Sequence, residues 1–217
     1  IYTGGTIGMV KDKKTGASFY QTYRTRSAFD ADKDGYTELG MLENLSFGTN
    51  IFYNIDNRNK INVEYHTTNE DRRGGNKLDL QPHKSDICEM TKHQIHSLNA
   101  NYNYVSLDGK NRLNTYFSTQ YIDRDSYYGA YQDPNAYGHT TDLTLLAGAM
   151  ALHKLDKLFF ASADITYGVE YSSNSLDDIF EAYNIPVSIP DFELYVPLSG
   201  CFPYRYCRSF RFGLSFI

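Results

Sequence analysis

The sequence predicts an all-β fold, a partial antiparallel transmembrane β-barrel of about 8–10 long strands with tight periplasmic turns and long extracellular loops. The first observation is a set of long stretches in which apolar and polar residues alternate, as side chains do on the two faces of a strand. The second is the order of the connections, which alternate between short turns and long polar segments, as in transmembrane barrels. The third is the lack of any run of 18 or more apolar residues, which excludes a transmembrane helix.

The clearest hairpin covers residues 139–173, and its two arms meet at a turn that we expect at residues 155–157. Each arm runs for about 14 residues, whereas strands of globular proteins typically have about 5–6. Strands of this length suit a barrel that crosses a membrane. We expect one face of the hairpin to meet lipid and the other to meet the lumen: Leu143, Leu145, Phe159, Ile165 and Val169 toward lipid, and Asp164, Thr166 and Glu170 toward the lumen.

Two further hairpins show the same alternation. Residues 42–56 pair with a strand that begins near Ile61, and residues 94–106 pair with residues 111–124. Each pair is joined by a short segment that contains turn-forming residues such as Asp, Asn and Gly. Weaker strand patterns complete the expected wall, at residues 17–27, 192–197 and 204–217.

Four long polar segments separate the hairpins and are predicted to be loops on one side of the membrane: residues 28–41, 69–93, 125–138 and 172–191. The prolines lie outside the clearest predicted strands, as the hydrogen bonding of a sheet requires. A β-sandwich is not expected to gather its long loops at one end so regularly. The sequence therefore favours the membrane barrel over a soluble β-barrel that acts as a binding module, an alternative that detergent dependence would distinguish.

The composition narrows the functional classes. The net charge of −5 argues against nucleic acid as a partner. The 20 tyrosines and 13 phenylalanines suit strands and the aromatic girdles of membrane barrels. The three cysteines show no metal-ligand spacing, and no set of catalytic residues stands out, so we expect a protein that is not an enzyme.

Three segments of the chain resemble TonB-dependent outer-membrane receptors, the barrels that import scarce nutrients. They are FYQTYRTRSAFDADKDGYTEL from residue 19, DNRNKINVEYHTTNEDRRGGNK from residue 56 and GVEYSSNSLDDIFEAYN from residue 168. The resemblance implies that residues 18–217 form part of such a barrel in the outer membrane of a Gram-negative bacterium. It also implies contact with outer-membrane lipid and import of a small nutrient such as a siderophore, another metal chelate or cobalamin. Coupling to TonB is expected only through a plug domain, which these residues do not include.

The first residues resemble a different family. IYTGGTIGMVKDKKTGA, residues 1–17, is similar to the opening strand and nucleophile loop of type I L-asparaginases. The resemblance implies that Thr6 corresponds to the nucleophile, and flanking glycines would let a substrate carbonyl approach the backbone. The family's second motif, HGTDT, does not occur, so we expect residues 1–17 to be an inactive segment foreign to the fold. The alternative, an asparaginase-like amidohydrolase, requires a parallel sheet with Thr6 at a strand end beside a Thr–Asp pair.

Residues 30–35, DADKDG, match the start of an EF-hand calcium loop. The twelfth position of such a loop should be Glu, but Met41 occupies it, and Glu38 stands at the ninth position. The segment is therefore not an EF-hand. We expect either a solvated acidic turn or a simpler calcium loop, with no other cofactor; the calcium ligands would be Asp30, Asp32 and Asp34.

Two groups of side chains in the predicted loops are candidates for ligand binding. Three cations beside a Gly-Gly pair would capture an anion through charge-assisted hydrogen bonds: Arg72, Arg73 and Lys77. Three tyrosines would stack on a planar ligand: Tyr127, Tyr128 and Tyr131. The alternatives are a solvated loop or contacts with lipid phosphates for the cations, and a membrane girdle or loop packing for the tyrosines.

Overall fold

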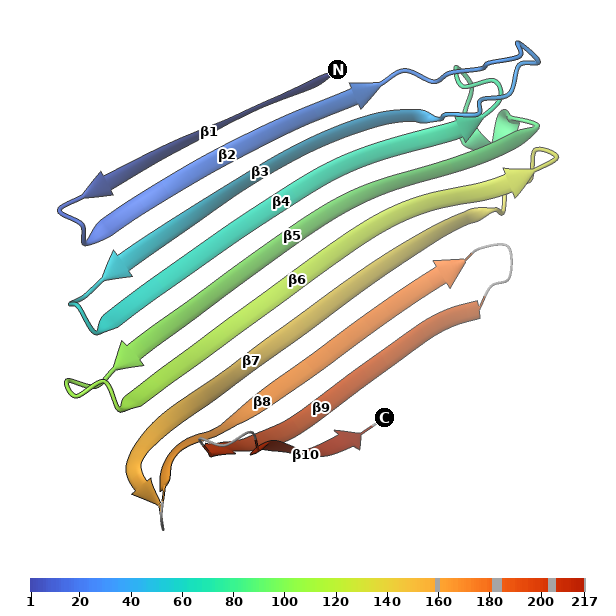
Figure 1. The fold of residues 1–217 in the computed structure, drawn as a ribbon. Helices are drawn as coiled ribbons and strands as arrows, with labels where there is room; N and C mark the ends of the chain where they lie inside the picture. The colour runs from blue at the N-terminus through green and yellow to red at the C-terminus, as the bar shows by residue number, and fades with distance from the viewer. Residues whose placement is uncertain (159–160, 181–184, 203–205, 217) are drawn as a thin grey trace.

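The computed structural model describes residues 1–158, 161–180, 185–202 and 206–216, which form a single antiparallel sheet (Figure 1). The sheet has ten strands, and each strand pairs only with its neighbours in the sequence, in the order β1 to β10. Within the described residues β1 and β10 lie at the two edges, so the sheet is an open wall. The predicted all-β architecture, a partial antiparallel barrel with about 8–10 long strands, is confirmed.

All ten strands are longer than the typical strand of about 5–6 residues. Their bounds are Tyr2–Lys11 (β1), Thr15–Arg26 (β2), Met41–Asn54 (β3), Asn59–Gly75 (β4), Ile87–Val105 (β5), Asn111–Ala130 (β6), Tyr137–Leu158 (β7), Ala161–Phe180 (β8), Ile185–Phe202 (β9) and Tyr206–Phe216 (β10). A short 3-10 helix, η1 (Pro82–Lys84), lies between β4 and β5. No helix in the described part of the chain is both long and apolar enough to cross a bilayer.

The connections fall into two groups at opposite ends of the sheet (Figure 1). At one end, here named the turn end, the strands are joined by short turns: residues 12–14, 55–58 and 106–110. At the other, here named the loop end, the connections are longer: residues 27–40, 76–86 and 131–136. The predicted separation of short turns from longer loops is therefore observed.

The two faces of the sheet differ in chemistry. One face carries an apolar band, here named the belt. The register of the paired strands places all its members on this face: Ile7, Met9, Phe19, Leu45, Phe47, Ile51, Val63, Leu98, Ala100, Phe117, Leu143, Leu145, Ala149 and Val169. Along β3 the belt runs from Leu45 to Tyr53, which is close to the 9–11 or so residues that a strand needs to cross a bilayer. Leu45 and Ile51 are 41 % and 44 % exposed, so the belt lacks a protein cover among the described residues.

The register of β7 and β8 confirms the predicted faces of the hairpin at residues 139–173. The residues expected to face lipid lie on the belt side: Leu143, Leu145, Ile165 and Val169. The residues expected to face the lumen lie on the opposite side, here named the polar face: Asp164, Thr166 and Glu170. Phe159 lies outside the described residues. The turn predicted at residues 155–157 is wrong, because β7 continues to Leu158 through a register shift that begins after Leu155.

The strands extend further toward the loop end than the sequence predicts. Most residues of three segments predicted as loops belong to strands, namely residues 69–93, 125–138 and 172–191. β4, β6 and β8 run on to Gly75, Ala130 and Phe180, and the strands that follow them begin at Ile87, Tyr137 and Ile185. Charged and polar residues stand on both faces there, mixed with apolar ones such as Met90 and Tyr127, so no clean alternation is visible in the sequence although the backbone ladder continues. Lys92 Nζ, for example, lies 3.6 Å from a carboxylate oxygen of its cross-strand partner Asp71. We name this region the loop-end extension, which comprises residues 69–75, 87–95, 122–130, 137–142 and 174–180.

Residues 1–17 belong to the same sheet as the rest of the chain. β1 pairs with β2 in antiparallel fashion along its whole length, and Thr6 lies opposite Tyr20. The expected boundary between residues 17 and 18 falls inside β2. Thr6 thus occupies the middle of an antiparallel edge strand, whereas the asparaginase alternative requires the end of a strand in a parallel sheet.

Candidate functional site

A line of polar side chains crosses seven strands on the polar face, within the loop-end extension and the adjoining parts of β2 and β3. Each strand from β2 to β8 contributes one member, which lies directly opposite the member on the next strand, so each side chain lies beside the next. We name this line the polar row, and it consists of Arg24, Asn44, Glu70, His93, Arg124, Thr140 and Asp178.

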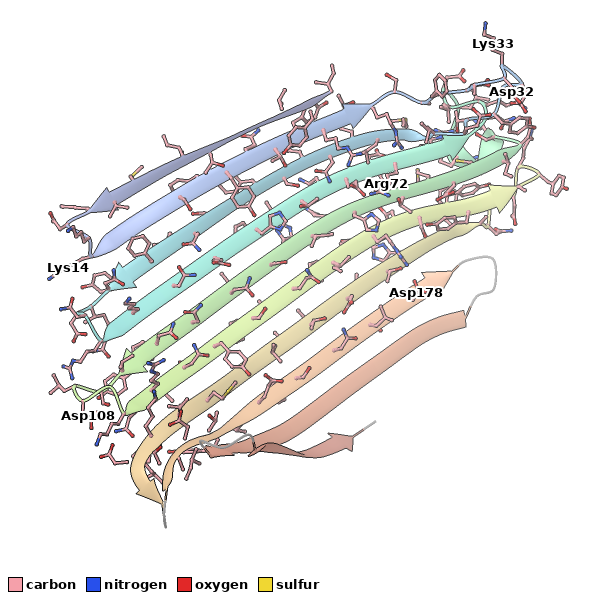
Figure 2. The ribbon with its side chains drawn as sticks, in the orientation of Figure 1. Lys14, Asp32, Lys33, Arg72, Asp108 and Asp178 are labelled. Carbon is pink, nitrogen blue, oxygen red and sulfur yellow. The ribbon has the colours of Figure 1, made fainter. Side chains whose placement is uncertain are left out.

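Glu70 organises one half of the polar row. Its carboxylate accepts a hydrogen bond from Asn44 Nδ2 at 2.9 Å and lies 2.6 Å from Nε of Arg72, which shares the polar face. The Glu70 side chain is only 16 % exposed, whereas that of Arg72 is 59 % exposed. Figure 2 shows Arg72 on this part of β4. Arg72 therefore offers a charged group to solvent from a fixed position.

Arg124 organises the other half. Its Nη2 donates a hydrogen bond to Thr140 Oγ1 at 2.8 Å and lies 3.9 Å from a carboxylate oxygen of Asp178. Thr140 in turn donates to Asp178, which Figure 2 shows on β8. Thr140 is buried, with only 7 % of its surface exposed. This half of the row is a relay of donors and acceptors across three strands.

Two nitrogen atoms at the centre of the row lack a hydrogen-bond partner. They are Nδ1 of His93 and Nε of Arg124, both buried, and the two residues are directly opposite each other on β5 and β6. Buried polar atoms are nearly always hydrogen-bonded, and each bond left unmade costs roughly 1–3 kcal/mol. A water molecule or a polar ligand is the natural partner for such a pair. Both nitrogens are enclosed, so a water molecule or ligand reaches them only after a movement of the surrounding side chains.

The three predicted cations do not converge on one site. Arg72 and Arg73 are consecutive residues of β4, so their side chains leave opposite faces of the sheet. Arg73 Nη2 reaches Ser85 Oγ at 3.2 Å, and Lys77 Nζ lies 2.7 Å from Asp86 Oδ1. The hydrogen bond from Lys77, with further bonds from neighbouring side chains, lowers the pKa of Asp86. Only Arg72 joins the polar row, while Arg73 and Lys77 stabilise the loop at residues 76–86.

The three predicted tyrosines are also separated. Tyr127 is completely buried, packs edge-on against Tyr137 with ring centroids 4.8 Å apart, and donates to the Asp133 carbonyl at 2.9 Å. Tyr128 follows it on the strand and is 49 % exposed, while Tyr131 lies in the loop and is 95 % exposed. The structure therefore assigns Tyr127 to packing and leaves Tyr128 and Tyr131 accessible to a ligand.

The predicted calcium ligands are brought together in the loop at residues 27–40. Oxygens of Asp30, Asp32 and Asp34 lie within 4.8 Å of one another and of a Glu38 oxygen. Asp30 also accepts hydrogen bonds from the backbone amides of Lys33 at 2.7 Å and Gly35 at 2.9 Å. The four carboxylates provide hard oxygen ligands of the kind that Ca²⁺ prefers. Glu38 is a fourth candidate ligand, which the failed EF-hand spacing obscured.

Sequence reasoning missed most of the polar row. Glu70 and His93 fall in the segment predicted as a loop at residues 69–93, and Arg124 is the last residue of a predicted strand. Their cross-strand register, which is what places them together, is a property of the paired sheet and leaves no mark at a fixed spacing in the sequence. The one available signal was that polar residues on these strands recur at every second position, in phase with the polar face of the belt region.

No protein-family model matches the sequence, and no curated protein sequence matches it. A solved structure is similar: the outer membrane transporter YddB from Escherichia coli superposes with a TM-score of 0.65 and 9 % sequence identity. The alignment covers 99 % of this chain and 33 % of the YddB chain, so this chain spans about a third of that structure. The fold is that of an outer-membrane barrel wall.

Proposed function

We propose that this chain forms part of the wall of a TonB-dependent outer-membrane receptor that binds and imports a scarce small nutrient, such as a metal chelate or cobalamin. In this proposal the belt contacts outer-membrane lipid, the turn end faces the periplasm and the loop end faces the outside of a Gram-negative cell. Energy coupling comes from TonB through a plug domain, as the sequence resemblance implies.

The observation that carries the proposal is the polar row. It combines arginine, histidine, carboxylate, hydroxyl and amide groups on the lumen side of the wall, just below the loops. A solute that enters from the loop end meets this row before it reaches the belt level. Two unpaired nitrogens lie at its centre, and a movement of the surrounding side chains would let them form hydrogen bonds to the solute.

Location is tested first. The intact protein, expressed in a Gram-negative host, should fractionate with the outer membrane and remain folded only in detergent or lipid. A protein that is folded and monodisperse without detergent would contradict the membrane assignment and support the soluble binding module instead.

Transport is tested with radiolabelled cobalamin and ferric citrate as probes of the two ligand classes. The variant Arg124→Ala with His93→Ala should lower uptake of the transported probe at least tenfold, because it removes both unpaired nitrogens. Gln94→Ala is the matched control, since Gln94 adjoins His93 on the opposite face. Uptake at the control rate by the double variant would contradict a role for the polar row.

A further inference from the structure

The lipid side of the wall carries a second group of charged residues, just beyond the belt. Cross-strand neighbours form a charged line there, which runs from Glu43 through Asp71, Lys92 and Asp125 to His139. It lies on the face opposite the polar row, so it does not take part in the proposed path of the solute. We name this line the outer rim.

Within the outer rim, three side chains with metal-ligating atoms converge. Asp123 and Asp125 are two residues apart on β6 and so share a face, and His139 on β7 lies directly opposite Asp125. His139 Nδ1 is 2.8 Å from Asp125 Oδ1 and 3.8 Å from Asp123 Oδ1. Ligands bound to one Zn²⁺ at about 2.0–2.2 Å are separated by roughly 3.3 Å, which lies between these two distances.

The charges of the cluster are not balanced by the protein. Among the described residues, neither Asp123 nor Asp125 forms an ion pair with a lysine or an arginine. Lys92, the nearest candidate by register, pairs instead with Asp71. Two carboxylates therefore share one imidazole, and a cation is the partner that would balance them.

A hollow of about 510 Å³ lies beside the cluster on the same face. Its wall includes Asp125 and His139 themselves, together with Met90, Lys92, Tyr137 and Ile179. The hollow gives a bound ion access to solvent and leaves room for water or an anion at its remaining coordination positions. The three ligands come from two paired strands and not from a mobile loop, so they are held in place without the metal.

We propose that Asp123, Asp125 and His139 bind a divalent transition-metal ion, with Zn²⁺ as the representative of this class. A mixed set of one imidazole and two carboxylates suits Zn²⁺ and its neighbours better than Mg²⁺, which prefers oxygen ligands alone. The ion links β6 to β7 and thereby fixes the hairpin that presents the exposed Tyr131. The proposed metal site lies on the face opposite the polar row, so it is independent of the transport proposed above.

The test uses the intact protein in detergent, stripped of metal with a chelator and kept in excess Ca²⁺ so that the acidic loop at residues 27–40 does not compete. Titration with Zn²⁺ by calorimetry should reveal one saturable site, and Co²⁺ should give the absorption bands of a bound ion. His139→Ala and Asp125→Asn should each weaken Zn²⁺ binding at least tenfold. Glu43→Gln and His96→Ala, on the same face but away from the cluster and from Lys92, should bind as the unmodified protein does.

The absence of a saturable Zn²⁺ site would overturn the proposal, as would unchanged affinity in both cluster variants. Equal loss of binding in the controls would also overturn it, because it would place the metal elsewhere. Asp123→Asn provides a third cluster variant if His139→Ala does not fold, as judged by heat-modifiable migration on gels.

Discussion

The belt region of the sheet and its loop-end extension share one continuous backbone ladder but use opposite side-chain chemistry. In the belt region one face is apolar and the other polar, as between Ala100 and Asn101 on β5. In the extension charged and polar side chains stand on both faces, and neighbouring strands are joined by hydrogen bonds such as those of Glu70 with Asn44 and of Arg124 with Thr140. The comparison teaches that strand pairing here continues beyond the end of the apolar belt.

The largest effect is expected where a charge is placed on the belt. Ala100→Arg should destabilise the folded protein in lipid vesicles by about 2–4 kcal/mol, because a charge near the middle of the bilayer loses its hydration. Asn101→Arg, one residue away on the polar face, should change the free energy of unfolding little. Urea titration in vesicles measures both.

An arginine placed on the same face of β5, but in the loop-end extension, tests whether the belt alone spans the bilayer. Gln94→Arg lies on the belt side of β5 but beyond the belt, so it should cost only about 0–1 kcal/mol. Equal destabilisation by Ala100→Arg and Gln94→Arg would contradict the assignment of the belt as the membrane-spanning band.

A smaller effect is expected in the polar row. Glu70→Gln removes the carboxylate that pairs with Arg72 and should lower stability by about 1 kcal/mol, a modest value because Arg72 is largely exposed. A double-mutant cycle with Arg72→Met isolates the pair. A coupling energy indistinguishable from zero would show that Glu70 acts through Asn44 or through packing alone.

The next effect concerns the order of the loop at residues 76–86 and depends on pH. Hydrogen bonds from Lys77, Asn76 and Gln132 lower the pKa of Asp86 in the folded protein relative to the unfolded chain. The stabilisation is therefore present above the unfolded pKa of about 3.9 and is lost as the pH falls through the folded value. Pepsin should cut this loop faster as the pH is lowered from 4.5 toward 2.

Asp86→Asn provides the control for the pH experiment. The variant lacks the titrating group, so its loop should be cut readily across the whole range, with a weaker dependence on pH. A variant that retains the full pH dependence would assign the effect to another carboxylate.

A substitution in the acidic loop at residues 27–40 is expected to change the stability of the sheet least. Binding of Ca²⁺ by the intact protein, measured by calorimetry, should be lost in Asp32→Ala, with a dissociation constant before substitution on the order of 10⁻⁴–10⁻³ M, as in other extracellular modules. The belt should remain unaffected, because the loop lies beyond the loop end. An identical titration for both proteins would identify the segment as a solvated acidic turn.

The contrast between the two regions also explains which parts of the structure the sequence predicts. The alternation through Leu143 and Leu145 indicates a strand because one of its faces must be apolar. The sequence predicts a loop at Arg72 and Arg73, because charged residues stand on both faces of β4 there and mask the alternation. The acidic loop was predictable because its carboxylates are close in sequence, whereas Glu70, His93 and Arg124 meet only through the register of three strands.

The nearest-neighbour order of the strands has a consequence for how such walls change in size. Because each strand bonds only to the strands before and after it in the chain, the sheet is an additive series of hairpins. A duplication or deletion of one hairpin would widen or narrow the wall without breaking any other pairing. The width of the wall is then set by the number of hairpins, and each added hairpin brings its own share of belt, polar face and connecting loop.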